Sequence, residues 1–170
     1  MTGPTGADFR PDEVLRLLNR HRVRFVVIGG LAAILHGSPS ITRDVDICHA
    51  HDGEDLIRLA GALREVSASL RGAPAGLPFR VDARTLANGD SFTFTTDIGS
   101  LDILATPAGT SGYDDLVRTA ETVSAFGEEF AVASLDDLIR MKRAAGRPKD
   151  RIELEILGAL REEIDGLPSG

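Results

Sequence analysis

The chain has 170 residues, and its apolar content of 42% is enough for one sizeable hydrophobic core. A net charge of -7, a pI near 5.1, no Trp and one Tyr exclude a protein that binds nucleic acid over its whole surface. The single cysteine, Cys48, excludes an internal disulfide, and no apolar run approaches the ~20 residues of a membrane span. We therefore expect a cytoplasmic protein with no membrane partner.

The N-terminal half of the sequence alternates helix and strand patterns. Pro11 and two acidic residues precede an apolar stripe at helical spacing, and Asp52 with Asp55 is typical of a helix N-cap. β-branched runs and alternating charged and apolar residues indicate strands. In chain order, these patterns predict a helix over residues 11–20, a strand over 23–28, a tight Gly29-Gly30 turn, a helix over 31–35, a strand over 43–48 and a helix from Asp52 to about residue 66.

The C-terminal half begins with a Gly-, Ala- and Pro-rich loop over residues 71–78. Its patterns predict strands over residues 79–82, 91–96 and 100–105, a short helix over 113–118, a hairpin of 123–126 with 130–133, a helix from the Ser134 N-cap through 145, and a helix from Pro148 to about 164. The fold class is α/β (α+β): a mixed sheet flanked by helices, with a small C-terminal hairpin and two C-terminal helices. We expect a single domain over residues 1–170, with a core of about 11–106 and a C-terminal helical part of about 107–165.

Two acidic residues on the strand over residues 43–48 are the strongest candidates for chemistry. Asp44 and Asp46 are two apart, so their carboxylates project from one face while Val45 and Ile47 enter the core. Like charges this close are costly without a cation between them, and oxygen ligands suit Mg²⁺. A third acid, Asp102, lies on another predicted strand and would complete the group if the strands adjoin. The alternative is an ordinary strand with a solvated polar face.

Gly29-Gly30 stands at the end of a strand that leads into a helix. Glycines let phosphate oxygens approach the backbone, and a helix N-terminus supplies free N–H donors. A glycine pair alone is more often only a tight turn. The order of strand, Gly-Gly, helix, loop and acid-x-acid strand is much more specific.

A basic segment lies near the C-terminus. Residues 140–151 contain six basic residues and one acidic residue, so this segment carries a charge of +5 and the remainder of the chain a charge of -12. This segment predicts a local phosphate site, and its alternative is a solvated helix face. The basic residues are Arg140, Lys142, Arg143, Arg147, Lys149 and Arg151.

These features resemble the nucleotidyltransferases of the DNA polymerase β superfamily. Their signature stands here as Ile28-Gly29-Gly30, thirteen residues, then Asp44-Val45-Asp46. More narrowly, GGLAAILHGSPSITRDVDI and SLDDLIRMKRAAGRPKDRIELEIL resemble the AbiEii type, which includes toxins of bacterial toxin–antitoxin pairs. The resemblance covers Arg24 to about Leu160 and implies the nucleotidyltransferase fold.

The resemblance implies a role for each acid. Asp44 and Asp46 would be metal ligands for Mg²⁺, with Mn²⁺ as an alternative. Asp102 would be a third metal ligand and the general base for the incoming hydroxyl. Lys142 would contact the nucleotide phosphates, and Asp150 would complete the site.

The resemblance also identifies nucleotide-binding residues. Gly29 and Gly30 would cradle the triphosphate, and Lys142, Arg147 or Lys149 would neutralise it. Thr42 stands where relatives carry Ser or Thr before the first acid. Many relatives read R-x-T-x-D where this chain has Ser40-Ile41-Thr42-Arg43-Asp44, so a basic residue has been lost from position 40 or its role has moved to Arg43.

The activity implied is Mg²⁺-dependent transfer of a nucleoside monophosphate from an NTP to a hydroxyl, with release of pyrophosphate. The first hypothesis is a toxin-like enzyme that acts on RNA, chiefly a tRNA end, and is restrained by a cognate antitoxin protein. The second is an enzyme that modifies a small molecule or a protein side chain. The third is a non-catalytic nucleotide-binding module of the same fold, against which the three retained acids argue.

Two further groups of candidate residues have a structural alternative. Cys48, His49, His51 and Asp52 include zinc ligands, but they span a strand end and favour one buried cysteine and two loop histidines. His36 follows the first signature segment, where a capping or core role and a functional role are both open.

Overall fold

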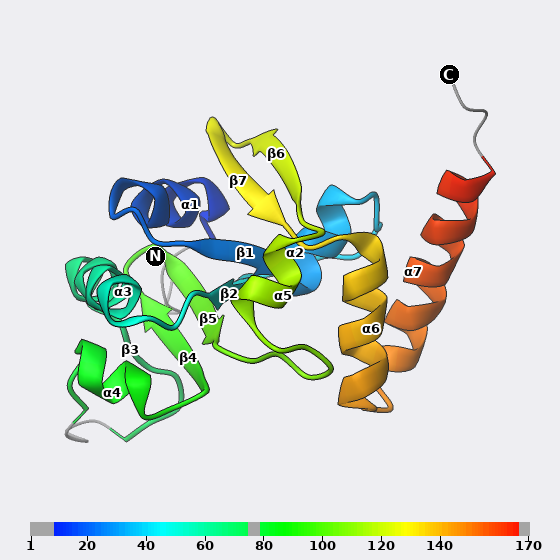
Figure 1. The fold of residues 1–170 in the computed structure, drawn as a ribbon. Coiled ribbons are helices and arrows are strands. Elements are labelled where there is room, and N and C mark those ends of the chain that lie inside the picture. Colours follow the sequence, from blue (N-terminus) through cyan, green and yellow to red (C-terminus); the bar gives the residue numbers. More distant parts are fainter. Residues whose placement is uncertain (1–8, 75–78, 167–170) are drawn as a thin grey trace, which may run out of the picture.

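The computed structural model describes residues 9–74 and 79–166. These ranges form seven helices and seven strands, arranged as in Figure 1: α1 (Pro11–Arg20), β1 (Phe25–Ile28), α2 (Gly29–Leu35), β2 (Asp44–His49), α3 (Gly53–Glu65), β3 (Ser69–Leu70), α4 (Ala83–Ala87), β4 (Ser91–Thr96), β5 (Gly99–Leu104), α5 (Tyr113–Val117), β6 (Glu121–Ala125), β7 (Glu128–Val132), α6 (Leu135–Ala145) and α7 (Asp150–Asp165).

One mixed sheet joins the strands in the order β3-β4-β5-β2-β1-β7-β6. Strand β2 pairs antiparallel with β1 and parallel with β5. Strand β7 pairs parallel with β1, so the predicted C-terminal hairpin β6-β7 extends the sheet instead of standing apart from it. The predicted mixed α/β fold is confirmed.

The register of the central strands separates polar from apolar side chains. Val45 of β2 pairs with Leu101 of β5, which pairs with Phe94 of β4, and all three are buried. One position further along, Asp46 pairs with Asp102. Because successive side chains of a strand point to opposite faces, the two acids lie on the face away from the Val45 side of the core.

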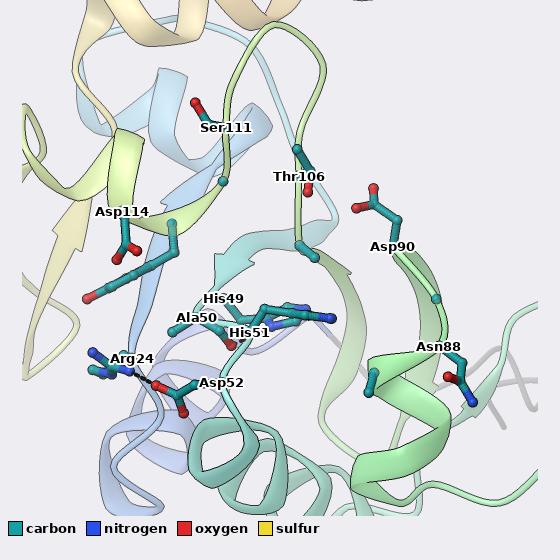
Figure 2. Close-up of a pocket in the computed structure, with 15 residues that line it drawn as sticks. Arg24, His49, Ala50, His51, Asp52, Asn88, Asp90, Thr106, Ser111 and Asp114 are labelled. Carbon is teal, nitrogen blue, oxygen red and sulfur yellow. Dashed lines mark hydrogen bonds and ion pairs between the residues drawn. The ribbon is translucent and has the colours of Figure 1, made fainter.

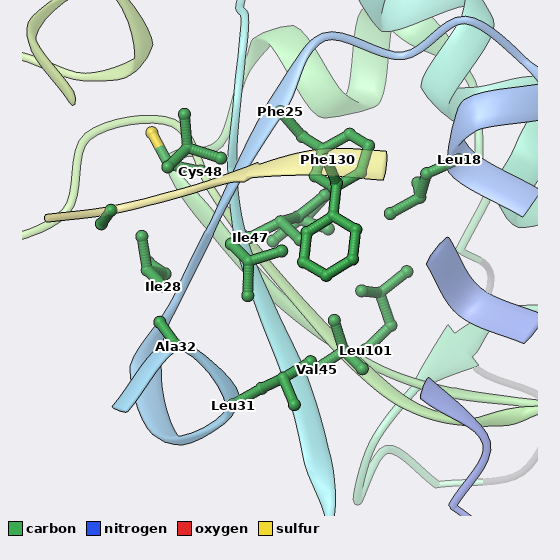
Figure 3. Close-up of a cluster of buried hydrophobic side chains, with 14 of the residues drawn as sticks. Leu18, Phe25, Ile28, Leu31, Ala32, Val45, Ile47, Cys48, Leu101 and Phe130 are labelled. Atoms are coloured by element: carbon green, nitrogen blue, oxygen red, sulfur yellow. The ribbon is translucent and has the colours of Figure 1, made fainter. Parts of the chain in front are cut away.

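Helix α1 covers the core face and contacts β2, β5 and β7. Its buried side chains come at helical spacing, as the apolar stripe predicts. Figure 3 shows Leu18 of α1 in one cluster with Phe25, Ile47, Leu101 and Phe130 from four strands. At the other end of the molecule α6 packs on α7, and α2 contacts both α6 and the central strands (Figure 1).

The predicted helix ends are confirmed where a side-chain cap marks them. The Asp52 side chain accepts a hydrogen bond from Asp55 N at the start of α3, and Ser134 accepts one from Asp137 N at the start of α6. Gly146 ends α6 in the left-handed conformation, with φ of 62°.

Three expected elements differ from the structure. Residues 79–82 form no strand, because Asp82 caps the short helix α4 by accepting a hydrogen bond from Thr85 N. Gly29 and Gly30 form the first turn of α2 instead of a turn before it. Helix α7 begins at Asp150, since residues 148–149 are a turn, and not at Pro148.

Some expectations lie at the limits of the described ranges. The predicted loop over residues 71–78 falls partly outside them, at 75–78, as do the two ends of the predicted domain, 1–8 and 167–170. No helix within the described part of the chain is long and apolar enough to cross a bilayer.

A matched pair of isoleucine substitutions tests the assigned core. Ile47 is 0% exposed and Ile152 is 71% exposed. Ile47→Ala should lower the free energy of unfolding by about 2–4 kcal/mol, because it removes buried methyl groups and leaves a cavity. Ile152→Ala should change it by less than about 0.5 kcal/mol in the same urea titration. Equal losses in the two variants would contradict the assigned core.

Candidate active site

Asp46 and Asp102 lie side by side at the centre of the sheet, on neighbouring parallel strands. Asp44 precedes Asp46 by two residues on β2 and therefore lies on the same face. One carboxylate oxygen of Asp46, Oδ1, is buried and has no hydrogen-bond partner among the described residues. A buried carboxylate oxygen without a partner is costly, and a bound cation would satisfy it.

The pKa of Asp46 also indicates that this carboxylate lacks a compensating cation. Burial, and after it the neighbouring carboxylates of Asp102 and Asp44, together raise the pKa of Asp46 to about 7. Lys142 acts in the opposite direction and lowers it. At Asp46 the effect of the neighbouring carboxylates thus exceeds that of Lys142.

The two glycines make room for this acid-bearing strand. Gly29 has a φ of +68°, and a Cβ at this position would overlap Asp46 Oδ2. A Cβ at Gly30 would lie 2.9 Å from Thr42 Oγ1. Thr42 Oγ1 in turn accepts a hydrogen bond from the backbone N–H of Asp44, at 3.4 Å. The start of α2 can therefore lie directly against β2 only because both residues lack a side chain.

A cavity of about 420 Å³ opens in front of the acids. Gly29, Gly30, Asp46 and Asp102 line it together with the cations Lys142 and Arg147. The rest of its lining is largely apolar, from Ile28, Ala33, Leu104, Pro107, Ala108, Leu138, Met141, Ala145 and Leu157. A concave, mostly apolar pocket with a few convergent charged groups is the usual form of a small-molecule site.

Asp150 holds the two cations of this cavity. It is only 3% exposed, and its carboxylate accepts hydrogen bonds from Lys142 Nζ at 3.1 Å and Arg147 Nε at 2.8 Å. Burial by itself raises the pKa of Asp150, but the hydrogen bonds from Arg147 and Lys142 outweigh this effect and lower the pKa. Asp150 does not line the cavity, so its contribution is to position Lys142 and Arg147.

The other predicted nucleotide-binding residues are not gathered in the cavity. Asp44 and Thr42 lie next to it along the chain but do not line it, and Arg43 and Lys149 are exposed and lie outside its lining. The basic segment is also divided, because Arg140 forms ion pairs with Asp115 and Asp137 instead of facing the acids.

Arg71 is a site residue that the sequence did not indicate. Its Nη2 donates to Asp102 Oδ1 at 2.7 Å and to the carbonyl oxygen of Phe94 at 2.9 Å, and its backbone N–H donates to Thr93 O. It follows the two-residue strand β3, in a segment whose Gly and Pro content predicts only a loop. No local pattern could have indicated this contact, because Asp102 is distant in the chain.

Arg71 affects which acids can bind a metal. Asp102 Oδ1 is engaged by Arg71. No three Asp, Glu, His or Cys side chains within residues 9–74 and 79–166 are arranged as a metal site. Mg²⁺ commonly takes only one or two protein carboxylates and completes its octahedron with water and phosphate oxygens. The carboxylates of Asp44 and Asp46, with the unpartnered Oδ1 of Asp46, fit that requirement.

The structure also places the secondary candidates. Ser40 Oγ donates to Glu153 Oε2 of α7 at 3.1 Å, so position 40 contacts the last helix. His36 Nε2 lies 2.8 Å from the carbonyl oxygen of Ala133, a contact typical of a packed histidine. Cys48 is buried. It and its histidine neighbours form no zinc site in the part of the chain that the structure describes.

Comparison with solved structures identifies the fold. LnuA, a lincosamide antibiotic adenylyltransferase with lincomycin bound, has a TM-score of 0.58 at 15% identity, over 90% of this chain and 99% of its own. The antibiotic-resistance factor ANT(2'')-Ia has 0.53 at 14%, over 90% and 88%. TM1012 from Thermotoga maritima, a proposed nucleotidyltransferase, has 0.50 at 18%, over 97% and 100%.

No family model and no curated protein sequence matches the chain. The likeness to solved structures nevertheless shows that this chain has the nucleotidyltransferase fold. The AbiEii type is not shown by these neighbours.

A glycine substitution tests the contact between α2 and β2. Gly29→Ala should lower the free energy of unfolding by more than about 2 kcal/mol, because the new Cβ meets the Asp46 carboxylate and the backbone has positive φ. Gly158→Ala is the control, since no atom lies within 4 Å of a Cβ there. That variant should gain up to about 1 kcal/mol from better helix propensity. A Gly29→Ala protein as stable as the parent in urea would contradict the close approach.

The pKa of Asp46 predicts a pH-dependent stability. The carboxyl titrates near ~4 when unfolded, but at about 7 in the folded protein. Between these values the folded state retains a proton that the unfolded state has lost, so the free energy of unfolding falls as pH rises. Asn cannot ionise, so Asp46→Asn removes this fall in the free energy of unfolding. With EDTA present, the variant should be more stable than the parent by about 2–4 kcal/mol near pH 8 and little changed near pH 4.

The control for this measurement is Asp97→Asn, the same change at an exposed acid on the turn between β4 and β5. Its effect on the urea midpoint should be small and independent of pH. A gain in Asp46→Asn that is the same at both pH values would show that Asp46 ionises normally.

Proposed function

We propose that this protein is a nucleotidyltransferase that moves a nucleoside monophosphate from an NTP to a hydroxyl acceptor and releases pyrophosphate. The proposal rests mainly on one observation, the pairing of Asp46 with Asp102 beside Gly29 and Lys142 in a single cavity. The fold shared with LnuA and ANT(2'')-Ia supports this class of reaction.

The residues of the site have complementary roles in this proposal. Asp44 and Asp46 would hold Mg²⁺ or Mn²⁺, which supplies positive charge to the triphosphate and the reacting oxygens. Asp102 would accept the proton of the incoming hydroxyl. Lys142 and Arg147, fixed by Asp150, would neutralise the negative charge of the departing pyrophosphate.

In this proposal the backbone at the start of α2 also holds the triphosphate. Gly29 and Gly30 begin helix α2, so their N–H groups belong to the helix N-terminus, where anions are favoured. Both glycines line the cavity that contains Lys142. A phosphate between these groups would receive backbone donors on one side and an ammonium on the other.

The first acceptor hypothesis is RNA, chiefly a tRNA end, with an antitoxin protein as the restraining partner. Three exposed cations support it: Arg143, Lys149 and Arg151 form no ion pair with the described residues. They neighbour Lys142 and Arg147 in the chain and could contact a phosphate backbone near the cavity.

The second acceptor hypothesis is a small hydroxyl-bearing molecule. LnuA is named as an adenylyltransferase of lincosamide antibiotics, and ANT(2'')-Ia as an antibiotic-resistance factor. The mostly apolar lining of the cavity suits a small acceptor better than it suits a polyanion. A protein side chain as acceptor and a non-catalytic module remain outcomes of the test.

Transfer is tested with each NTP labelled at the α-phosphate, in the presence of Mg²⁺. Acceptor mixtures are total tRNA, no added acceptor, and a panel of hydroxyl-bearing antibiotics that includes lincomycin. Label should appear on tRNA if the first hypothesis holds and on a small molecule if the second does. Self-labelling would indicate a protein acceptor.

Matched variants identify the groups responsible. Asp102→Asn should retain NTP binding but lose transfer by about 10²–10⁴-fold, because proton removal from the acceptor fails. Asp97→Asn should transfer like the parent. Mg²⁺ with NTP should raise the melting temperature of the parent and not that of Asp44→Asn or Asp46→Asn. Transfer by Asp102→Asn at the parental rate, or no labelled acceptor at all, would contradict the proposal.

A further inference from the structure

A second cavity, of about 600 Å³, lies at the opposite end of strands β1 and β2 from Gly29 and Asp46. Arg24, which precedes β1, and His49, at the end of β2, both line it. Asn88 and Asp90, between α4 and β4, and Asp114, in the first turn of α5, complete much of its polar lining. Figure 2 shows Asp90 and Asp114 on opposite sides of this pocket, with His49 and His51 between them.

His49 is the most informative group in this pocket. It is only 2% exposed, and its Nδ1 lies 2.9 Å from the carbonyl oxygen of Ala50. A carbonyl oxygen can only accept, so Nδ1 carries the hydrogen and Nε2 presents a lone pair. No described residue forms a hydrogen bond with Nε2, and this nitrogen is not among the fully buried atoms that lack a partner, so it keeps some exposure. Burial lowers the pKa of His49, which favours this neutral form with a free acceptor.

The charges that remain unpaired in this pocket are negative. Arg24 is the cation of the lining, and it already pairs with the carboxylates of Asp52 and Asp55. Asp90 and Asp114 form no ion pair or side-chain hydrogen bond within residues 9–74 and 79–166. An anionic ligand would therefore meet two free carboxylates and no free cation.

The acceptor groups of this pocket are not gathered as a multi-residue metal site. No three His, Asp, Glu or Cys side chains of the described residues are arranged to hold one, in this pocket or elsewhere. What the pocket offers is a set of separated acceptors: the imidazole nitrogen Nε2 of His49, two carboxylates and the amide oxygen of Asn88. Such a set matches a ligand rich in N–H donors and positive charge.

We propose that this second pocket binds an organic cation with primary ammonium groups, in which His49 Nε2 accepts a hydrogen bond from the ligand and Asp90 and Asp114 neutralise its charge. The pocket volume lies within the range of small-molecule sites. The proposal is independent of the transfer reaction, because none of these three residues lines the cavity that holds Asp46 and Asp102.

Isothermal titration with spermidine, without nucleotide and at physiological salt, tests the proposal. Spermidine should bind with a stoichiometry of one. Asp90→Asn and Asp114→Asn should each weaken binding by about five- to tenfold through loss of a charge-assisted contact. Both positions are exposed, so the substitutions leave the core unchanged. His49→Leu should also weaken binding while the melting temperature shows that the protein remains folded.

The matched control is Glu155→Gln, which removes one negative charge from the exposed surface of α7. It should bind spermidine like the parent, as should Asp102→Asn. Absence of binding at millimolar spermidine, or equal binding by the parent and the Asp90→Asn, Asp114→Asn double variant, would overturn the proposal. A loss of spermidine affinity in Glu155→Gln as large as in Asp90→Asn would also overturn it, since spermidine would then be attracted to the acidic protein as a whole. None of these three results changes what the transfer assay would show.

Discussion

The pairing of Asp46 with Asp102 across strands β2 and β5 is the constraint on which the rest of the site depends. Two directly opposed carboxylates repel, and burial of Asp46 adds a desolvation cost, so its pKa rises to about 7. On the other face of the same strands, Val45 and Leu101 belong to the hydrophobic core. Strong packing on one face therefore holds together an unfavourable charge arrangement on the other.

The cations near this pair are held by different means. Lys142 faces the acids through the cavity and is fixed by the buried Asp150, whereas Arg71 binds Asp102 directly and is anchored on the carbonyl of Phe94. Arg71 thus compensates Asp102, and Asp46 retains an unpartnered oxygen. The uncompensated negative charge is concentrated on the Asp44 and Asp46 side of the site, where a cation would be bound most strongly.

Local patterns predicted the parts of this structure that local interactions determine. The alternation over residues 43–48 predicted which face carries Asp44 and Asp46, and the caps at Asp52 and Ser134 predicted helix starts. The pairing of β2 with β5 depends on a register between segments that are distant in the chain. The sequence therefore predicts that Asp102 joins the other two acids only if the two strands are neighbours. Arg71 escaped prediction for the same reason.

The structure also gives the glycine pair a second purpose. The sequence predicted that Gly29 and Gly30 admit phosphate oxygens to the backbone, whereas the structure shows that they admit the Asp46 carboxylate and the Thr42 hydroxyl. The two uses are compatible, because one concerns the Cα side of the turn and the other its N–H groups. A side chain at Gly29 would separate the helix N-terminus from the acids, and the site needs both in one cavity.

The distribution of charge limits how the protein can recognise a partner. Of the six cations between residues 140 and 151, Arg140, Lys142 and Arg147 are paired with buried or half-buried acids. These pairs make the positive potential short-ranged, while the remainder of the chain carries -12. Such a field attracts a compact group such as a triphosphate to the cavity and repels an extended polyanion elsewhere. In the proposed reaction, an acceptor of either class would therefore be recognised over a small area next to the cavity.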